Sequence, residues 1–134
     1  MPASTSDFPS PPNFLFVYGT LRTGELRHHM LAAARILTIV PAEVAGSLLD
    51  FWEYPGLVAA ENGSRVRGEL IELQSFSLIA DALDEEEGPD FRRELTDCVG
   101  LDGRKCLAWV YRFTGSTEGA EVVVSGDWKA RRMP

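Results

Sequence analysis

A glycine-containing segment near the start of the chain has the composition of an anion-binding loop. It reads Tyr18-Gly19-Thr20-Leu21-Arg22 and lies between an apolar run and a helical pattern. Backbone amides that stay unpaired at such a turn can bind a carboxylate, or an oxyanion that develops during a reaction. A plain loop with Gly19 as its turn residue explains the same pattern. A phosphate-binding loop is excluded, because Glu25 and Leu26 stand where that motif requires Lys and Ser or Thr.

An acidic run supplies a candidate general acid or base. Six of the ten residues from Asp81 to Asp90 are acidic and none is basic. The run lies at the end of a predicted helix, where the macrodipole disfavours negative charge by roughly 0.3–1 kcal/mol per group. Neighbouring charges, the dipole and burial all raise a carboxylate's pKa toward the range that serves catalysis near neutral pH. Glu87 is the best candidate, because Leu83, four residues earlier, belongs to the apolar face of the helix. A solvated acidic helix end is the simpler alternative.

Other catalytic chemistries receive little support from the pattern. The acids of the run occupy divergent positions, and His28 and His29 point to different sides of one helix, so we expect no metal site. Cys98 and Cys106 are too few and wrongly spaced to bind zinc. No Ser-His-Asp or Cys-His nucleophile has a recognisable local signature. Tyr54-Pro55-Gly56 is predicted to be a turn, although Tyr54 could also form the wall of a pocket.

The elements that must position these residues alternate between strand and helix patterns. The apolar run Phe14–Tyr18 predicts a strand buried on both faces, and Glu25–Leu37 and Ser75–Glu87 have helical spacing, the second ending at Gly88. The ranges Ile39–Leu49 and Val66–Leu73 have strand patterns. Strands outnumber helices, so we expect an α+β fold, a curved and mostly antiparallel sheet or small barrel with two flanking helices.

A hairpin is predicted near the C-terminus. Asp102-Gly103 lies between two strand-like runs, residues 92–98 and 104–113, which is a strong hairpin signal. With these two residues as the turn, Val99 would face Cys106, and Cys98 would point to the opposite face of the sheet. The two thiols are therefore expected to stay reduced. Trp128, in the segment Ser125-Gly126-Asp127-Trp128, is expected to seal the edge of the core.

The composition fits one folded domain and excludes several classes of protein. The 134 residues carry a net charge of -7, and 45% of them are hydrophobic. This acidic balance disfavours binding to nucleic acid, and the apolar runs are far shorter than the ~20 residues of a membrane-spanning helix. Residues 1–13 read as a flexible leader, which leaves a single domain over 14–134. The leader lacks the features of a signal peptide, so we expect a cytoplasmic protein.

Taken together, these segments resemble the gamma-glutamylcyclotransferase-like family, in particular its AIG2-like type and the bacterial gamma-glutamylamine cyclotransferases. The likeness covers about residues 14–128 and depends on several motifs in a fixed order. They are Val17-Tyr18-Gly19-Thr20-Leu21-Arg22, Tyr54-Pro55, Val66-Arg67-Gly68-Glu69-Leu70, Leu83-Asp84-Glu85-Glu86-Glu87-Gly88, Phe91-Arg92-Arg93, Trp109-Val110-Tyr111 and Ser125-Gly126-Asp127-Trp128. Many members have Tyr where this chain has Phe91.

The resemblance implies a six-stranded, largely antiparallel barrel and an enzyme that works without metal or organic cofactor. Its small-molecule substrate would carry a γ-glutamyl group, which cyclises to 5-oxoproline and releases an amine or amino acid. Glu87 would be the catalytic acid and base. The substrate-binding residues would be Tyr18, Gly19, Thr20, Leu21, Tyr54 and Arg93.

Two other functions remain open at this point. A binding module could keep the pocket, bind a small γ-glutamyl or amino-acid-like metabolite and turn nothing over. An interaction protein could use the acidic face of Asp81 to Asp90 against a basic partner. The sequence does not choose among leaving groups or indicate an oligomeric state.

Overall fold

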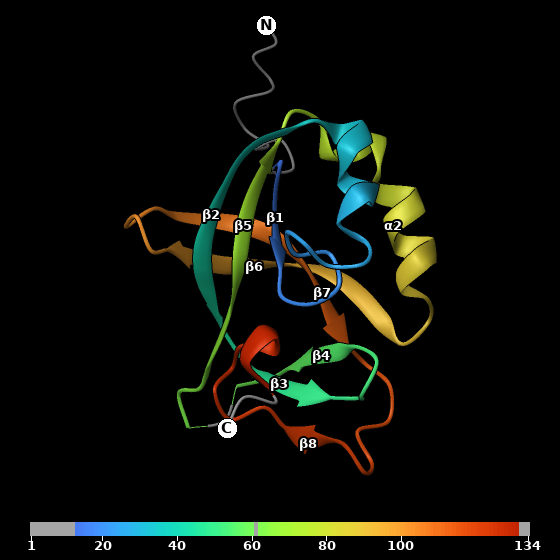
Figure 1. Cartoon of the computed structure of the whole chain (residues 1–134), viewed down its shortest axis with the longest axis vertical. Helices are drawn as coiled ribbons and strands as arrows, with labels where there is room; N and C mark the ends of the chain where they lie inside the picture. Colours follow the sequence, from blue (N-terminus) through green and yellow to red (C-terminus); the bar gives the residue numbers. More distant parts are fainter. Residues whose placement is uncertain (1–12, 61, 132–134) are drawn as a thin grey trace, which may run out of the picture.

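The computed structural model describes residues 13–60 and 62–131, and its central feature is a closed β-barrel (Figure 1). Five strands form the barrel in the order β1-β5-β2-β6-β7, and all four of these neighbouring pairs are antiparallel. A parallel bridge between Leu15 and Trp109 joins β7 back to β1 and closes the ring. The strands are β1 (Phe14–Val17), β2 (Ile36–Ala45), β5 (Arg65–Leu73), β6 (Phe91–Gly100) and β7 (Lys105–Phe113).

The barrel closes with five strands, so the expected number of six is wrong. The remaining strands, β3 (Ser47–Asp50), β4 (Pro55–Val58) and β8 (Glu121–Val122), continue the sheet outward from β7 instead of entering the ring. They lie below the barrel in Figure 1. Because β1 already occupies an edge of β7, β4 reaches β7 through one parallel bridge only, Leu57 to Arg112.

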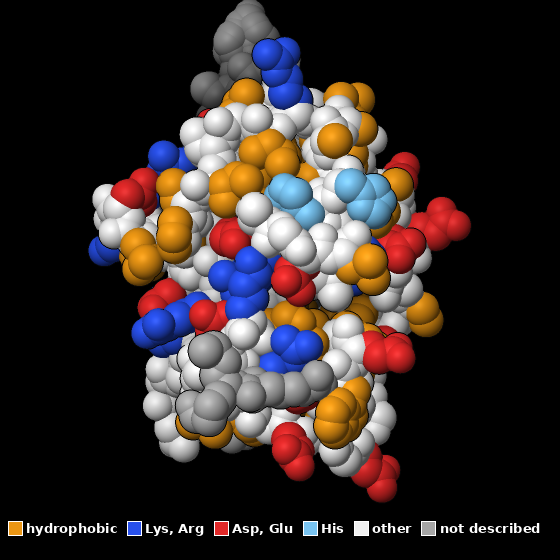
Figure 2. Space-filling model, viewed as in Figure 1, with side chains coloured by type: hydrophobic (Ala, Val, Ile, Leu, Met, Phe, Trp, Pro, Cys, Tyr) orange, Lys and Arg blue, Asp and Glu red, His pale blue; other side chains and the backbone are white. Residues whose placement is uncertain are grey.

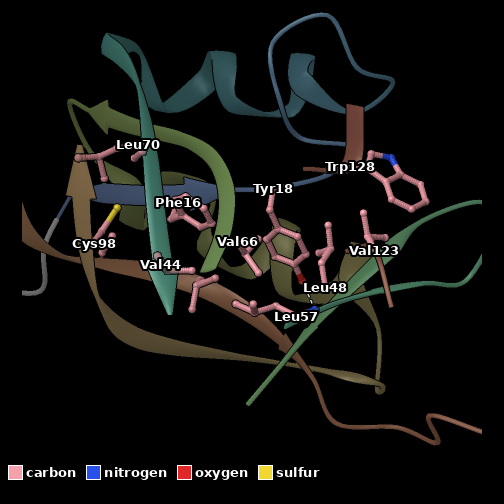
Figure 3. Packing of buried hydrophobic residues seen from close by; sticks show 13 residues of the cluster. Phe16, Tyr18, Val44, Leu48, Leu57, Val66, Leu70, Cys98, Val123 and Trp128 are labelled. Carbon is pink, nitrogen blue, oxygen red and sulfur yellow. Dashed lines mark hydrogen bonds between the residues drawn. The ribbon is translucent and has the colours of Figure 1, made fainter. Parts of the chain in front are cut away.

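The central strand β1 is buried on both faces, as its continuous apolar run predicted. Phe16 faces the barrel interior, where it packs in one core cluster with Tyr18 (Figure 3). Leu15 and Val17 face the other way and pack in a second cluster beneath the helices. The period of two along the strand therefore supplies both cores.

The helices are shorter than their patterns suggested. The predicted helix over 25–37 is a 3-10 helix, η1 (His28–Ala34), and Leu26 is 83% exposed. Turn hydrogen bonds hold the preceding residues, including one from the Arg27 N–H to the Thr20 carbonyl at 2.8 Å. Arg35, with φ of 61°, ends η1, and β2 begins at the next residue.

The predicted helix over 75–87 divides into η2 (Phe76–Leu78) and α2 (Ala80–Glu87). Ile79, with φ of -120°, separates the two. Gly88 terminates α2 with φ of 82°, as expected from its position. Both α2 and η1 lie on one side of the barrel (Figure 1).

Two local predictions about turns are wrong. Pro55 and Gly56 do not form a turn but begin β4, and a Cβ on Gly56 would lie 2.8 Å from Phe51 and 2.9 Å from Phe113. The packing of these rings therefore requires glycine in a strand.

The hairpin exists, but its loop has three residues instead of two. Gly100 and Arg104 close it through a hydrogen bond of 2.7 Å, and Gly103 has φ of 90°. This shift of one position pairs Cys98 directly with Cys106, so the prediction that they face opposite sides is wrong. Both are free thiols.

The ends of the described chain are tied to the core. Residues 1–12 of the expected leader lie outside the described residues, whereas the Asn13 side chain accepts a hydrogen bond from the Phe76 N–H at 2.9 Å. Trp128, at the start of η3 (Trp128–Ala130), is 2% exposed and seals the barrel core as expected. Over the described part of the chain, we find no helix of the length and hydropathy needed to cross a bilayer.

Candidate active site

A narrow cavity lies at the C-terminal end of β1 and opens into a wider cleft. The cavity has a volume of about 30 Å³, enough for a water molecule or a small polar group. The cleft has a volume of about 340 Å³. Residues from the loop after β1, from the segment before β4, from the end of α2 and from the start of β6 line both spaces: Thr20, Arg27, Tyr54, Glu87 and Phe91.

Glu87 is the last residue of α2 and lines the cavity with a largely buried carboxylate. Its side chain is 10% exposed, because Leu83, one turn earlier, is anchored in the core. Arg27 Nη2 donates a hydrogen bond to Glu87 Oε2 at 2.9 Å. Burial raises the pKa of Glu87 above its ordinary value, and the charge and hydrogen bond of Arg27 oppose this rise. The group can therefore exchange protons closer to neutral pH than an exposed glutamate.

Residues Gly19, Thr20 and Leu21 line the same cavity. Among residues 13–60 and 62–131, no protein group accepts a hydrogen bond from the N–H of Gly19, Thr20 or Leu21. A Cβ on Gly19 would lie 2.5 Å from the ring of Pro55, so only glycine fits between the loop and β4. Unpaired amides beside a cavity suit a carboxylate ligand.

Buried polar contacts hold this loop in place. Arg22 does not line the cavity and points away from it. Its Nη1 donates to Asp127 at 2.8 Å, and its Nε donates to Glu69 at 3.4 Å. The Thr23 N–H also donates to Glu69, at 2.9 Å. Gly68 lets β1 approach closely, since a Cβ there would lie 2.1 Å from the Val17 carbonyl. These contacts join two of the motifs found in the sequence, the one that contains Gly19 and the one that contains Gly68.

His28 supports the loop from η1, and neither histidine lines the cavity or the cleft. His28 Nδ1 lies 2.9 Å from the Leu21 carbonyl oxygen, a hydrogen bond that requires the proton on Nδ1. His29 is exposed. Both lie side by side on the face over η1, visible in pale blue in Figure 2.

Tyr18 lines the cavity, but its hydroxyl has structural partners. The hydroxyl donates to the Tyr111 carbonyl at 2.6 Å and accepts from the Leu57 N–H at 3.2 Å, the contact drawn in Figure 3. Burial, followed by the nearby charge of Glu87, raises the pKa of Tyr18. The phenol therefore stays neutral and fastens β1 to β7 and β4.

Aromatic side chains form the outer wall. Tyr54 stacks on Phe51 with ring centroids 5.5 Å apart and meets the edge of Phe91 at 6.0 Å. Tyr54 and Phe91 both line the cleft. Phe91 contributes an apolar ring to the wall of the cleft and has no hydroxyl to form a hydrogen bond there.

Arg93, expected among the substrate-binding residues, does not line the cavity or the cleft. Its Nε and Nη2 donate to the two oxygens of Asp84 at 2.8 and 3.1 Å. The guanidinium also lies over the ring of Trp109, 4.5 Å from its centroid. Arg93 takes this position because it lies on β6 opposite Tyr111 of β7, and its side chain there points toward the middle of α2.

Sequence reasoning did not select Arg27, which lies within the range 25–37 that was predicted to be helical. Arg27 lies outside η1, and it joins Thr20 to Glu87. One weak signal existed: the acidic run carries no base of its own, so a cation from elsewhere in the chain had to approach it. No group of three or more His, Cys, Asp or Glu side chains in the described ranges is arranged to hold a metal ion.

Comparison with known proteins identifies relatives of the whole domain. The sequence model of the family "Gamma-glutamyl cyclotransferase, AIG2-like" matches residues 15–130. The gamma-L-glutamyl-butirosin B gamma-glutamyl cyclotransferase of Niallia circulans is 41% identical over 128 residues, which cover 91% of this chain and 78% of the relative. A putative gamma-glutamylcyclotransferase of Vibrio cholerae is 29% identical and covers 89% of this chain and 97% of its own.

Solved structures share the fold. YkqA from Bacillus subtilis superposes with a TM-score of 0.71 at 27% identity, over 92% of this chain, which spans 42% of the length of YkqA. An AIG2-like protein from Mus musculus superposes with a TM-score of 0.66 at 22% identity, over 79% of this chain and 80% of its own. Because the family match covers nearly all of the barrel and the site, the chain belongs to the AIG2-like gamma-glutamyl cyclotransferase family.

Proposed function

We propose that this member of the family converts a γ-glutamyl amide to 5-oxoproline and a free amine. The substrate's own α-amine nitrogen attacks its γ-glutamyl carbonyl carbon, and the bond from that carbon to the leaving nitrogen breaks. The attacking nitrogen starts as an ammonium and ends as the lactam N–H, so it loses two protons, and the leaving nitrogen takes up two and departs as an ammonium. The reaction therefore consumes no water and needs no redox partner.

The observation that carries this proposal is the meeting of a buried carboxylate with unpaired backbone amides in one cavity. Glu87 can accept a proton, and the amides of Gly19, Thr20 and Leu21 can hold an anion. A γ-glutamyl group carries both partners, an α-ammonium and an α-carboxylate. The cavity matches its two charges with two groups of opposite character.

In the proposed mechanism, Glu87 acts as general base and then as general acid. The loop amides hold the α-carboxylate, which brings the α-ammonium toward Glu87. Glu87 takes a proton from that ammonium, the amine attacks, and Glu87 returns the proton to the leaving nitrogen. The attacking nitrogen loses its second excess proton as the lactam forms, and this proton passes to the released amine, again through Glu87. Folding the substrate for an intramolecular attack supplies much of the rate enhancement, since well-oriented groups react as though present at very high concentration.

The cleft outside the cavity is proposed to take the leaving amine. At about 340 Å³ it has room for a bulky group, consistent with the name of the Niallia circulans relative, which specifies a gamma-L-glutamyl-butirosin B substrate. Glu53, Glu86 and Asp90 line the cleft, while Arg27 is the basic residue in its lining. This balance favours amines without a carboxylate over amino acids.

The test is release of 5-oxoproline and amine from a panel of γ-glutamyl amines, γ-glutamyl dipeptides and larger amides. We expect equal amounts of the two products from at least one amide. If ligands bind, as measured by calorimetry, but no member of the panel is turned over, the chain is a binding module instead.

A further inference from the structure

Arg27 connects the two halves of the active site. Its backbone N–H and its Nε donate to the carbonyl and to Oγ1 of Thr20, both at 2.8 Å. Its Nη2 donates to Glu87 Oε2 at 2.9 Å, and its Nη1 lies 3.5 Å from Glu86 Oε2. The planar guanidinium thus spans from the anion-binding loop to the end of α2, across 60 residues of sequence.

The contact leaves one oxygen of the carboxylate unengaged. The hydrogen bond from Arg27 goes to Oε2, and in the described part of the chain no group donates to Oε1 of Glu87. The hydrogen bond to one oxygen restrains the carboxylate, and its other oxygen remains able to accept a proton.

The charged and titratable groups near Glu87 lie on several different segments of the chain. Arg27 approaches from the segment before η1, and Glu86 precedes Glu87 on α2. Tyr18, directly after β1, and Tyr111 of β7 lie close enough for their pKa to respond to Glu87. Both phenols are buried and their pKa is raised, so they stay neutral. Arg27 is therefore the cation that compensates the buried charge of Glu87.

We propose that Arg27 is a positioning residue that holds Glu87 by one oxygen, keeps it ionised between turnovers and couples it to the anion-binding loop. The link to turnover rests on the proposed function, whereas the effect on the ionisation of Glu87 does not. A purely structural role would weaken the fold without changing how Glu87 titrates.

The first test follows the titration of the Glu87 carboxyl by carbon-13 NMR in the free protein, with Glu87→Gln used to assign the signal. In Arg27→Gln the buried carboxylate of Glu87 loses its positively charged partner, so the pKa of Glu87 must rise above the wild-type value. Glu86→Gln should move it in the opposite direction, because the charge of Glu86 raises the pKa of Glu87. Arg104→Gln, at the far hairpin, removes the same charge from the molecule and should leave the titration unchanged.

The second test is the pH profile of kcat/KM. The active enzyme carries ionised Glu87, so activity rises with pH through its pKa. Arg27→Gln should shift this acid limb to higher pH and lower kcat/KM by roughly 10-fold or more below neutral pH. Arg27→Lys keeps the positive charge but lacks the planar guanidinium that also donates to Thr20. The acid limb of its pH profile should therefore lie near the wild-type position, with kcat/KM only partly recovered.

The outcomes separate this inference from the proposed function. An unshifted Glu87 titration in folded Arg27→Gln overturns the role of Arg27, and so does a titration in Arg27→Lys displaced as far as in Arg27→Gln. The expected shifts in a protein that releases no 5-oxoproline would support the electrostatic role and contradict the proposed function alone. If Arg27→Gln does not fold, two variants still test the role: the pKa of Glu87 should stay near its wild-type value in Arg27→Lys and fall in Glu86→Gln.

Discussion

Two carboxylates on one short helix have arginine partners but opposite environments. Asp84 has both oxygens engaged by Arg93, and Tyr111 also donates to it, at 2.6 Å. Glu87, one turn later, is bonded by one nitrogen of Arg27 and is far more buried, 10% exposed against 41% for the Asp84 side chain. The difference shows that a charged partner alone does not decide whether the pKa of a carboxyl rises or falls.

The two pKa directions follow from this geometry. Hydrogen bonding to Arg93 lowers the pKa of Asp84 despite some burial, whereas burial raises the pKa of Glu87 despite Arg27. Asp84 is thus fixed as an anion that ties α2 to β6. Glu87 is able to change protonation state in the cavity.

Replacing the two acids should produce the largest contrast. Glu87→Gln keeps the shape of the side chain but removes its proton-transfer capacity, so turnover should fall by about 10²–10⁴-fold with binding of 5-oxoproline retained. Asp84→Asn should retain most of the turnover. Steady-state kinetics with calorimetric titration measure both, and Glu87→Gln turnover close to wild type would remove Glu87 from the mechanism.

Substitution of Gly19 should break the site without touching either acid. In Gly19→Val the new side chain must displace Pro55 or the loop, so we expect ligand binding to weaken by roughly 100-fold. Gly19→Ala should give a smaller loss in the same direction, because its Cβ meets the same ring. Calorimetry measures the binding, and circular dichroism checks that both variants are folded. Wild-type affinity in folded Gly19→Val would mean that the amides of this loop do not hold the ligand.

The outer cleft should select leaving groups by charge. Matched substrates are the γ-glutamyl amides of 1,4-diaminobutane, n-pentylamine and 4-aminobutyrate, which end in a cation, a methyl group and an anion. We expect kcat/KM to fall in that order by about 2- to 10-fold overall, and added salt to reduce the difference.

A matched pair of variants assigns this selectivity to the cleft. Asp90→Asn should narrow the range between the cationic and anionic substrates, while Asp97→Asn, an exposed acid on β6 outside the cleft lining, should not. Equal rates for all three substrates in the wild type would show that the cleft acids do not act on the leaving group.

The smallest expected effect is an opposite pH dependence of stability. Asp84 contributes stability above its usual pKa, and this contribution disappears as pH falls through its lower folded pKa. Glu87 has the reverse sign, since its raised pKa makes ionisation in the folded state unfavourable as pH rises. Thermal unfolding between pH 4 and 8 should show Asp84→Asn destabilised by about 1 kcal/mol or less, mainly at higher pH. Glu87→Gln should gain relative to wild type over the same range, and changes of equal sign would contradict the contrast.

Local patterns were enough to select the cavity-lining residues whose signals lie within one element. Glu87 could be chosen because helical period relates it to Leu83 and because Gly88 ends the helix. The loop at Gly19 could be chosen because a buried strand stops there. In both cases the relevant contacts lie within a few residues along the chain.

The missed features depend on contacts between distant segments. Arg27 reaches Glu87 across 60 positions, and Arg93 is drawn to Asp84 by the way β6 passes α2. The number of barrel strands depends on one bridge, Leu15 to Trp109. No period or turn signal in a single sequence reports such contacts.

The central claim is an intramolecular cyclisation, and isotope labelling of the product tests it most directly. The protein is incubated with a γ-glutamyl amide in water enriched in oxygen-18, and the products are analysed by mass spectrometry against a blank without protein. The account predicts 5-oxoproline free of the label, in an amount equal to the released amine. Glutamate that carries oxygen-18 would mean that water attacks the carbonyl, and would contradict it.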